Sequence, residues 1–331
     1  MIVANIPAST GEPEVNWILA QHSFVPEMIV PEEFLLDLPI NVMVDQMLNF
    51  VDLMKKWLKD WVTDGHSPLH HRLLYHTKMP RCVQDAYSTM SLYFLARGPS
   101  NQDSIFQLID DRVTQLFQTR WARNYCQTTS LPFGRLSRVQ AMVAYQIIRL
   151  FDGDIRMRAH AEADDMWAQT RRSASPISGG DASTSPLNQS IPFDGIVSLD
   201  ESVVTWKLWI LTESIRRTWL ASNLIMELYH YIKQGWSQCP GSIPFTLRAG
   251  LWEAETAYAW FAAQRNHEDA LFVPIFKQPA MMQATSPRQV DEFGHALLGI
   301  TWGLERMARW HDRMGETLDS PLTERAPVVS N

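Results

Sequence analysis

Hydrophobic positions recur at helical spacing through most of this chain. Residues three and four apart share one face of an α-helix, because the helix turns once every ~3.6 residues. The pattern predicts helices over residues 41–63, 80–96, 103–118, 136–151, 206–241, 249–265 and 289–313. No stretch alternates apolar and polar residues as a strand does, so the expected fold class is all-α, in a single large helical bundle.

The longest predicted helix, residues 206–241, carries charge inside its apolar stripe. Glu213 and Arg217 lie four residues apart in the middle of that stripe, with the carboxylate first, which is the favourable order for an ion pair on a helix. The opposite face is also apolar, so the helix is expected to be buried. An unpaired buried charge costs several kcal/mol, and we therefore expect Glu213 and Arg217 to form a structural ion pair.

Composition divides the chain into a helical domain and three polar or irregular segments. Residues 1–40 are rich in Pro and predict an irregular lead-in, and residues 41–313 form the helical domain. Within it, residues 173–198 are rich in Ser, Gly and Pro and predict a flexible loop. Residues 314–331 predict a polar tail. Asp103 or Ser104 is placed to cap the helix at 103–118.

Charge and cysteine content exclude several classes of protein. The net charge of −7 argues against a general affinity for nucleic acid. Cys82, Cys126 and Cys239 are widely spaced, so neither a disulfide framework nor a cysteine zinc site is expected. No signal peptide and no membrane span is predicted, which favours an intracellular, cytoplasmic location. The 13 Trp and 15 Met suit either a bulky core or a cavity for a large apolar ligand.

Motifs for metals and cofactors are weak. Asp110-Asp111 and Asp164-Asp165 lack the third acid of an aspartate-rich magnesium motif, and we interpret them as solvated helix charges. Four histidines without a metal-binding spacing are expected in a loop or on the surface: His66, His70, His71 and His76. Glycine-rich phosphate loops are also missing, so the sequence predicts no metal and no cofactor.

Several segments resemble the regulatory, or middle homology, region of fungal binuclear zinc cluster transcription factors. The similarity extends from about residue 30 to about residue 312 and is carried by residues 93–101 (YFLARGPSN), 109–119, 138–162, 208–220 (LWILTESIRRTWL), 228–260 and 291–312. The resemblance implies a fungal origin, a helical regulatory body and a link to specialised metabolism. The family's six-cysteine segment has no counterpart in residues 1–40, so no nucleic-acid binding by a zinc cluster is expected.

Polar residues among the aromatic positions leave two interpretations open. One is a buried network that sets helix register, drawn from Tyr145, Gln146, Arg149, Asp152, Asp154, Arg156, Glu213, Arg216, Arg217 and Tyr231. The other is a catalytic site in which Arg216, Tyr145 or Arg217 polarises a carbonyl. In that site four tryptophans would bind an apolar substrate: Trp206, Trp209, Trp219 and Trp236.

Two functions follow from these interpretations. The first is a cofactor-independent cyclase, of the pericyclase or Diels–Alderase type, that acts on an apolar terpenoid or polyketide. The second is a transcriptional regulator or co-regulator without its own DNA-binding domain, which would be nuclear. The partners expected are an apolar small molecule and, left open, a protein partner or a homo-oligomer.

Overall fold

The computed structural model describes residues 40–118, 131–163, 201–237, 244–265, 272–274 and 285–315. The predicted lead-in, the loop at 173–198 and almost all of the tail lie outside these residues, as do the runs of sequence between the described ranges. The statements below concern the described residues.

Helices dominate, and the expected all-α class is confirmed. In chain order the elements are α2 (Ile40–Asp64), α3 (Arg81–Leu95), α4 (Gln102–Gln118), α5 (Leu131–Phe151), α6 (Ile155–Ala163), α8 (Glu201–Gln234), β1 (Pro244–Thr246), α9 (Ala257–Arg265), β2 (Phe272–Pro274), the 3₁₀ turn η7 (Pro287–Gln289), α11 (Glu292–Trp302) and α12 (Leu304–Arg313).

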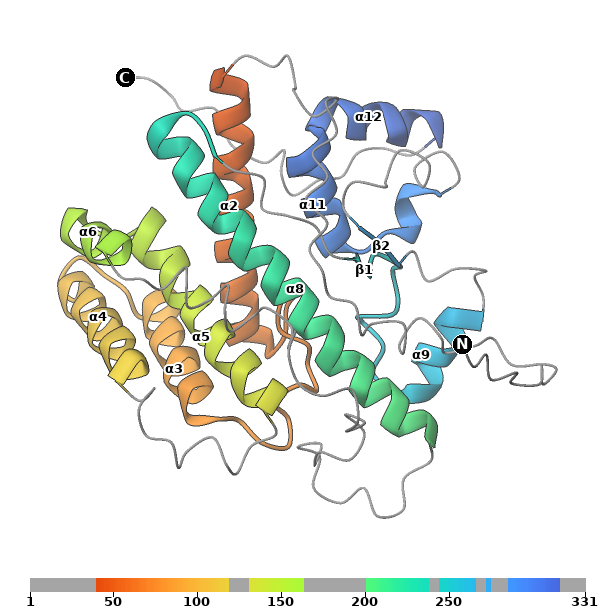
Figure 1. Ribbon diagram of the computed structural model, residues 1–331, viewed down its shortest axis with the longest axis horizontal. Helices are drawn as coiled ribbons and strands as arrows, with labels where there is room; N and C mark the ends of the chain where they lie inside the picture. The colour runs from red at the N-terminus through yellow and green to blue at the C-terminus, as the bar shows by residue number, and fades with distance from the viewer. Residues whose placement is uncertain are drawn as a thin grey trace, which may run out of the picture.

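The long helix α8 crosses the molecule and separates two groups of elements (Figure 1). On one side α3 packs on α2, α4 and α5, and α5 packs on α6 and α8. On the other side β1 and α9 pack on α8, and α11 packs on α12. Helix α2 contacts both groups, since it packs on α3 and α5 and also on α11. Both faces of α8 are therefore covered, which explains why its sequence is apolar nearly all round.

Apolar side chains from both groups meet in one continuous core. The largest fully buried apolar side chains include Trp57 of α2, Trp209 of α8, Trp260 of α9 and Trp310 of α12. These residues come from positions up to 253 apart along the chain, counting from Trp57 to Trp310. The tryptophan enrichment thus serves a bulky core that joins the two groups.

The structure shifts several predicted boundaries. Helix α5 begins at Leu131, five residues before the predicted start, and α8 runs from Glu201 to Gln234 rather than over 206–241. Helix α6 was not predicted from the sequence. Helix α4 begins at Gln102, so Asp103 lies in its first turn and does not precede the helix as its cap.

Residues 249–256 are not helical, which corrects the prediction of a helix over 249–265. The backbone at Arg248 forms a bridge with Val290, and the amide of Gly250 donates to the Glu253 carboxylate at 2.8 Å. This tight turn buries Leu251 and Trp252 against the core. The turn buries the same apolar residues that a helix would have buried, so the apolar pattern does not require a helix here. Only α9, from Ala257 onward, is helical.

The predicted helix over 289–313 is also broken. Gly303 has φ 85° and ψ 149°, a conformation that residues with a Cβ rarely adopt, and it ends α11 and begins α12. The two helices can therefore change direction and bury separate faces.

One short pair of strands was not expected. β1 pairs antiparallel with β2, with Phe245 opposite Val273. Three residues are too few to show strand alternation in a sequence.

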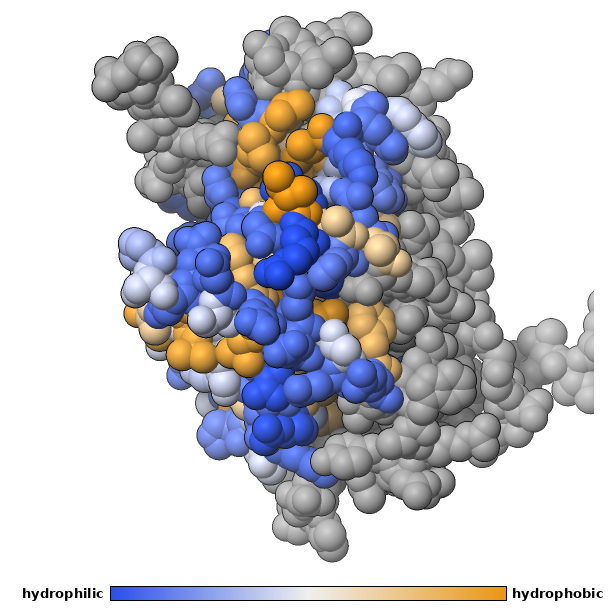
Figure 2. All heavy atoms as spheres, turned by 90° about the vertical axis from the view of Figure 1, so that its left-hand side faces the viewer, coloured by the Kyte–Doolittle hydropathy of each residue, from blue (hydrophilic) through white to orange (hydrophobic). Residues whose placement is uncertain are grey.

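The surface formed by α4 and α6 is largely hydrophilic, with several separate hydrophobic patches (Figure 2). Within the described residues no helix combines the length and hydropathy needed to cross a membrane.

Candidate functional site

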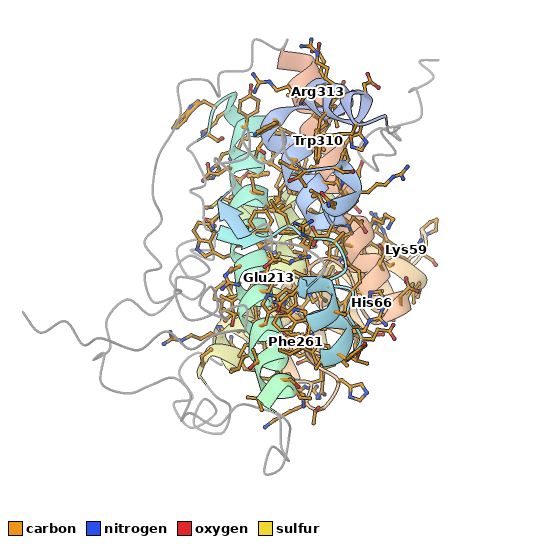
Figure 3. The ribbon with its side chains drawn as sticks, turned by 90° about the vertical axis from the view of Figure 1, so that its right-hand side faces the viewer. Lys59, His66, Glu213, Phe261, Trp310 and Arg313 are labelled. Carbon is orange, nitrogen blue, oxygen red and sulfur yellow. The ribbon has the colours of Figure 1, made fainter. Side chains whose placement is uncertain are left out.

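Glu213, Arg216 and Arg217 lie at the middle of α8, and their side chains are at most 1% exposed. The spacing of three and four residues places both guanidinium groups beside one carboxylate. Arg216 Nη1 donates to Glu213 Oε2 at 2.9 Å, and Arg217 Nε donates to Glu213 Oε1 at 3.3 Å. The predicted pair of Glu213 and Arg217 is thus present and buried. Figure 3 shows Glu213 in the interior of the molecule.

Glu213 also holds the strand β1. The Thr246 amide donates to Glu213 Oε1 at 3.0 Å, and the Thr246 hydroxyl donates to Oε2 at 3.2 Å. The carboxylate therefore accepts four hydrogen bonds, which replace the water that it loses on burial.

Arg217 joins three further parts of the chain. Its Nη1 donates to the Pro68 carbonyl at 3.3 Å, and its Nη2 donates to the Thr246 carbonyl at 3.3 Å and to Asp291 Oδ2. The guanidinium carbon lies 4.0 Å from the ring centre of Trp252 and 4.9 Å from that of Phe293. Aromatic faces and acceptors surround the guanidinium, as expected for a buried arginine.

Asp291 begins the helix α11. Its Oδ1 accepts the Gly294 amide at 2.7 Å as a side-chain cap, while Oδ2 accepts from Arg217. Burial raises the pKa of Asp291 to about 7, and the nearby Arg217 partly opposes this shift. Two acids and two arginines thus meet in one cluster, which we call the ion clamp: Glu213, Arg216, Arg217 and Asp291.

The ion clamp has the geometry of a structural connector. It ties α8 to β1, to the α2–α3 loop and to α11, and the donors of Arg217 are already bound to protein acceptors. Freeing such a group for a substrate would leave buried charge unpaired, at a cost of about 3–5 kcal/mol.

Tyr145 lies elsewhere, on α5 between α3 and α4. Burial raises the pKa of Tyr145 to about 12, and a hydrogen bond with the Thr89 side chain partly opposes this shift. Asp85 of α3 and Arg112 of α4 are the charged side chains that influence this pKa. The structure therefore does not bring Tyr145 together with Arg216 and Arg217, as one shared catalytic site would require.

The four predicted substrate-binding tryptophans divide into three places. Trp206 and Trp209 are buried one turn apart on α8, and Trp209 packs against Trp260 with ring centres 5.4 Å apart. Trp219 is buried ten residues further along the same helix, roughly 15 Å away. Trp236 follows the end of α8 and is 59% exposed. Only Trp206 and Trp209 share one environment.

The α2–α3 loop connects to the same region. His70 and His71 lie in this loop, one of the two positions expected for them, and each is only 3% exposed. His70 stacks on Trp61 with ring centres 4.1 Å apart, and His71 packs edge-on against Trp252 at 5.0 Å. Burial lowers the pKa of both histidines to about 3.

A second polar cluster holds α4, α5 and α6 together. Arg149 Nε donates to Asp110 Oδ1 at 3.1 Å, and His160 Nδ1 lies 3.3 Å from Asp110 Oδ2. Asp110 is 19% exposed, so it is a partly buried partner of Arg149 and not a solvated charge. Asp154 and Arg156, by contrast, lie largely at the surface.

The described part of the chain contains no group of three His, Cys, Asp or Glu residues that could hold a metal. A cavity of about 10 Å³ lies among α2, α5 and α8. That volume admits about one water molecule, whereas small-molecule sites commonly enclose roughly 300–1,000 Å³.

Sequence reasoning missed the partners that complete the ion clamp. Asp291 lay within a predicted helix, although an acidic residue just before an apolar helical run is a known start signal. Trp252, Phe293 and the Pro68 carbonyl carried no signal, because they approach Arg217 only through the fold.

No protein-family model matches the chain, and no solved structure matches it. Transcription factor gsfR2 of Penicillium aethiopicum is 29% identical over 253 residues, which cover 74% of this chain and 57% of that protein. The chain thus spans little more than half the length of this relative, and it is similar to a fungal transcription factor.

Proposed function

We propose that this chain acts as a transcriptional regulator and that its helical body is the regulatory part. The observation that carries the proposal is the 29% identity to transcription factor gsfR2 across 74% of the chain. Similarity over that length involves the packed helices and not one short motif. A regulator of this kind would work in the nucleus and act through protein partners, since its net charge of −7 disfavours broad contact with DNA.

The packing of the interior favours this function over the cyclase. The cyclase expected from the sequence would need a cavity for its substrate beside a free donor of Arg216, Arg217 or Tyr145. Arg217 is bound on every side, Arg216 is paired with Glu213, and Tyr145 lies apart from both. In the packing described, the cavity of about 10 Å³ among α2, α5 and α8 is too small for an apolar polycyclic molecule.

Disruption of the gene in the source fungus tests the proposal. A regulator predicts that transcripts of a set of target genes change, and that reintroducing the intact gene restores them. A cyclase predicts instead that transcripts stay the same while one unreacted pathway intermediate accumulates. Unchanged transcripts together with an accumulated intermediate would refute the regulator.

A complementation series links that phenotype to the fold. Arg217→Met removes the centre of the ion clamp, so we expect it to fail to restore the transcripts. Lys59→Ala alters an exposed position of α2 and should restore them fully.

A further inference from the structure

Two buried indole N–H groups on α8 have no hydrogen-bond partner in the described part of the chain. They are Nε1 of Trp206 and Nε1 of Trp209, in residues that are 5% and 1% exposed. An indole N–H can only donate a hydrogen bond, and burying it without an acceptor costs free energy. Such groups in a native structure call for an explanation.

Three other buried tryptophans have hydrogen-bond acceptors for their indole N–H groups. Trp57 Nε1 donates to Glu292 Oε1 at 2.5 Å, Trp252 Nε1 to the Ser67 carbonyl at 3.0 Å, and Trp310 Nε1 to the Thr285 carbonyl at 3.0 Å. The fold supplies an acceptor to each of these three indole groups. The two unpaired donors lie together, one helical turn apart.

Aromatic rings pack against Trp209, which carries one of the two unpaired donors. Trp209 lies 5.4 Å from Trp260 and 6.4 Å from Trp252, measured between ring centres. Trp260 belongs to α9, a nine-residue helix that covers this part of α8 and carries Phe261 beside it (Figure 3). We call these rings the aromatic wall: Trp206, Trp209, Trp252 and Trp260.

We propose that the aromatic wall is a binding site for a flat aromatic molecule with carbonyl oxygens, which enters when α9 moves away from α8. The rings provide stacking surfaces, and the two indole donors provide hydrogen bonds to the carbonyl groups. In the closed state described here α9 fills the place of the ligand. The inference rests on the proposed function, for which the ligand would be the effector.

The wall adjoins the ion clamp. Trp252 packs on Trp209 and also lies 4.0 Å below the guanidinium of Arg217. A ligand that moves the Trp209 ring would also displace the Trp252 ring, which packs against the Arg217 guanidinium. Occupancy of the wall would then change how the clamp holds α11 to α8, and a partner protein could detect that change.

A pair of matched probes tests the site. Anthraquinone-2-sulfonate carries two carbonyl groups on a flat tricyclic frame, and anthracene-2-sulfonate has the same frame without them. Isothermal titration of the full chain should show the quinone binding about fourfold to a hundredfold more tightly, since each of the two hydrogen bonds contributes a factor of roughly two to ten. In NMR spectra of protein labelled with ¹⁵N-tryptophan, addition of the quinone should shift two indole N–H resonances.

Three variants locate the effect. Trp206→Phe and Trp209→Phe keep a ring but lose a donor, so each should remove one of the shifted resonances and weaken quinone binding about threefold to tenfold. Trp236→Phe, at an exposed position, should change neither. The inference is overturned if the quinone does not bind at millimolar concentration, if both probes bind equally, or if the resonances that shift are not those of Trp206 and Trp209. None of these results would alter the transcripts in the disruption experiment, so the two proposals fail separately.

Discussion

At the scale of single residues, the contribution of the ion clamp to stability depends on every buried charge keeping its oppositely charged partner. A buried ion pair often contributes little net stability, because both charges lose their hydration. Removal of one partner is strongly destabilising, because the other charge then stays buried and unpaired. Arg217 is the member with the most partners, since it contacts Glu213, Asp291, the Pro68 carbonyl and Trp252. Its loss should therefore be the most damaging.

Arg217→Met is expected to lower the free energy of unfolding by about 3–5 kcal/mol, because Asp291 then lies buried without its cation. Adding Asp291→Asn removes the stranded charge and keeps an acceptor for the Gly294 amide, so the double variant should be no less stable than the single one. Urea unfolding of the single and double variants measures the coupling.

The surface pair of Arg309 and Glu305 provides the matched control, with side chains 72% and 66% exposed. Arg309→Met should change stability by less than about 0.5 kcal/mol. Equal losses at Arg217 and Arg309 would contradict the role given to the clamp.

His70 should make the fold sensitive to acid. Its pKa is about 3 in the fold because burial disfavours the charged ring, against an ordinary value of 6.5. Above pH ~6.5 the ring is neutral in both states and has no effect; as pH falls, only the unfolded state takes up the proton. His70→Phe, which can still stack on Trp61, should reduce the stability lost between pH 7 and pH 5 by about 2 kcal/mol.

Exposed His76 supplies the control, and His76→Phe should leave the pH dependence unchanged. Asp291 acts in the opposite direction: with its pKa raised to about 7, its contribution is present at low pH and is lost as pH rises toward 7. The wild type and both histidine variants retain Asp291, so its contribution cancels when their pH profiles are compared. An identical pH profile for wild type and His70→Phe would show that His70 is not buried neutral.

At the scale of elements, α11 depends on a close approach at its first turn. A Cβ at Gly294 would lie 2.5 Å from Leu247 Cδ2 and 2.7 Å from Val290 Cγ1. Alanine has a higher helix propensity than glycine, but the steric clash of its Cβ with Leu247 and Val290 outweighs that gain here. Gly294→Ala should destabilise by about 1–3 kcal/mol, as thermal or urea unfolding would measure.

Gly98 offers the same substitution in open space, since a Cβ there meets nothing within 4 Å. Gly98→Ala should change stability by less than about 0.5 kcal/mol. A stabilised Gly294→Ala variant would mean that α11 lies further from Leu247 than described.

At the scale of the whole molecule, α8 is shared by both groups of elements. The α5 side and the β1, α9 side each bury a face of this one helix, and the ion clamp adds α11 and the α2–α3 loop. Neither group can lose its packing without exposing apolar surface on α8. Residues 41–313 are therefore proposed to behave as one domain.

The two groups should unfold in one cooperative transition. Far-ultraviolet circular dichroism reports the helices, whereas tryptophan fluorescence reports the surroundings of single side chains, of which α8 carries three, α2 two, and α9, α11 and α12 one each. The two unfolding curves should coincide. In Arg217→Met the clamp is lost, and the transitions should move apart or broaden. Two separate transitions in the wild type would indicate two domains.

The sequence by itself determined the helices whose stabilising contacts are local or repeat every turn. The period of apolar residues located α2, α3, α4 and most of α8, and the four-residue spacing of Glu213 and Arg217 indicated their pairing. These features depend on residues close together in the chain, so the helical geometry alone relates them.

Tertiary structure alone decided what reaches those positions from far away. Asp291 lies 74 residues from Arg217, and Trp252 and the α2–α3 loop approach from other directions. The same packing replaced the predicted helix at 249–256 with a buried turn and left the donors of Trp206 and Trp209 together without acceptors. Apolar periodicity specifies that a residue is buried, but its partner is chosen by whichever distant element completes the close-packed interior.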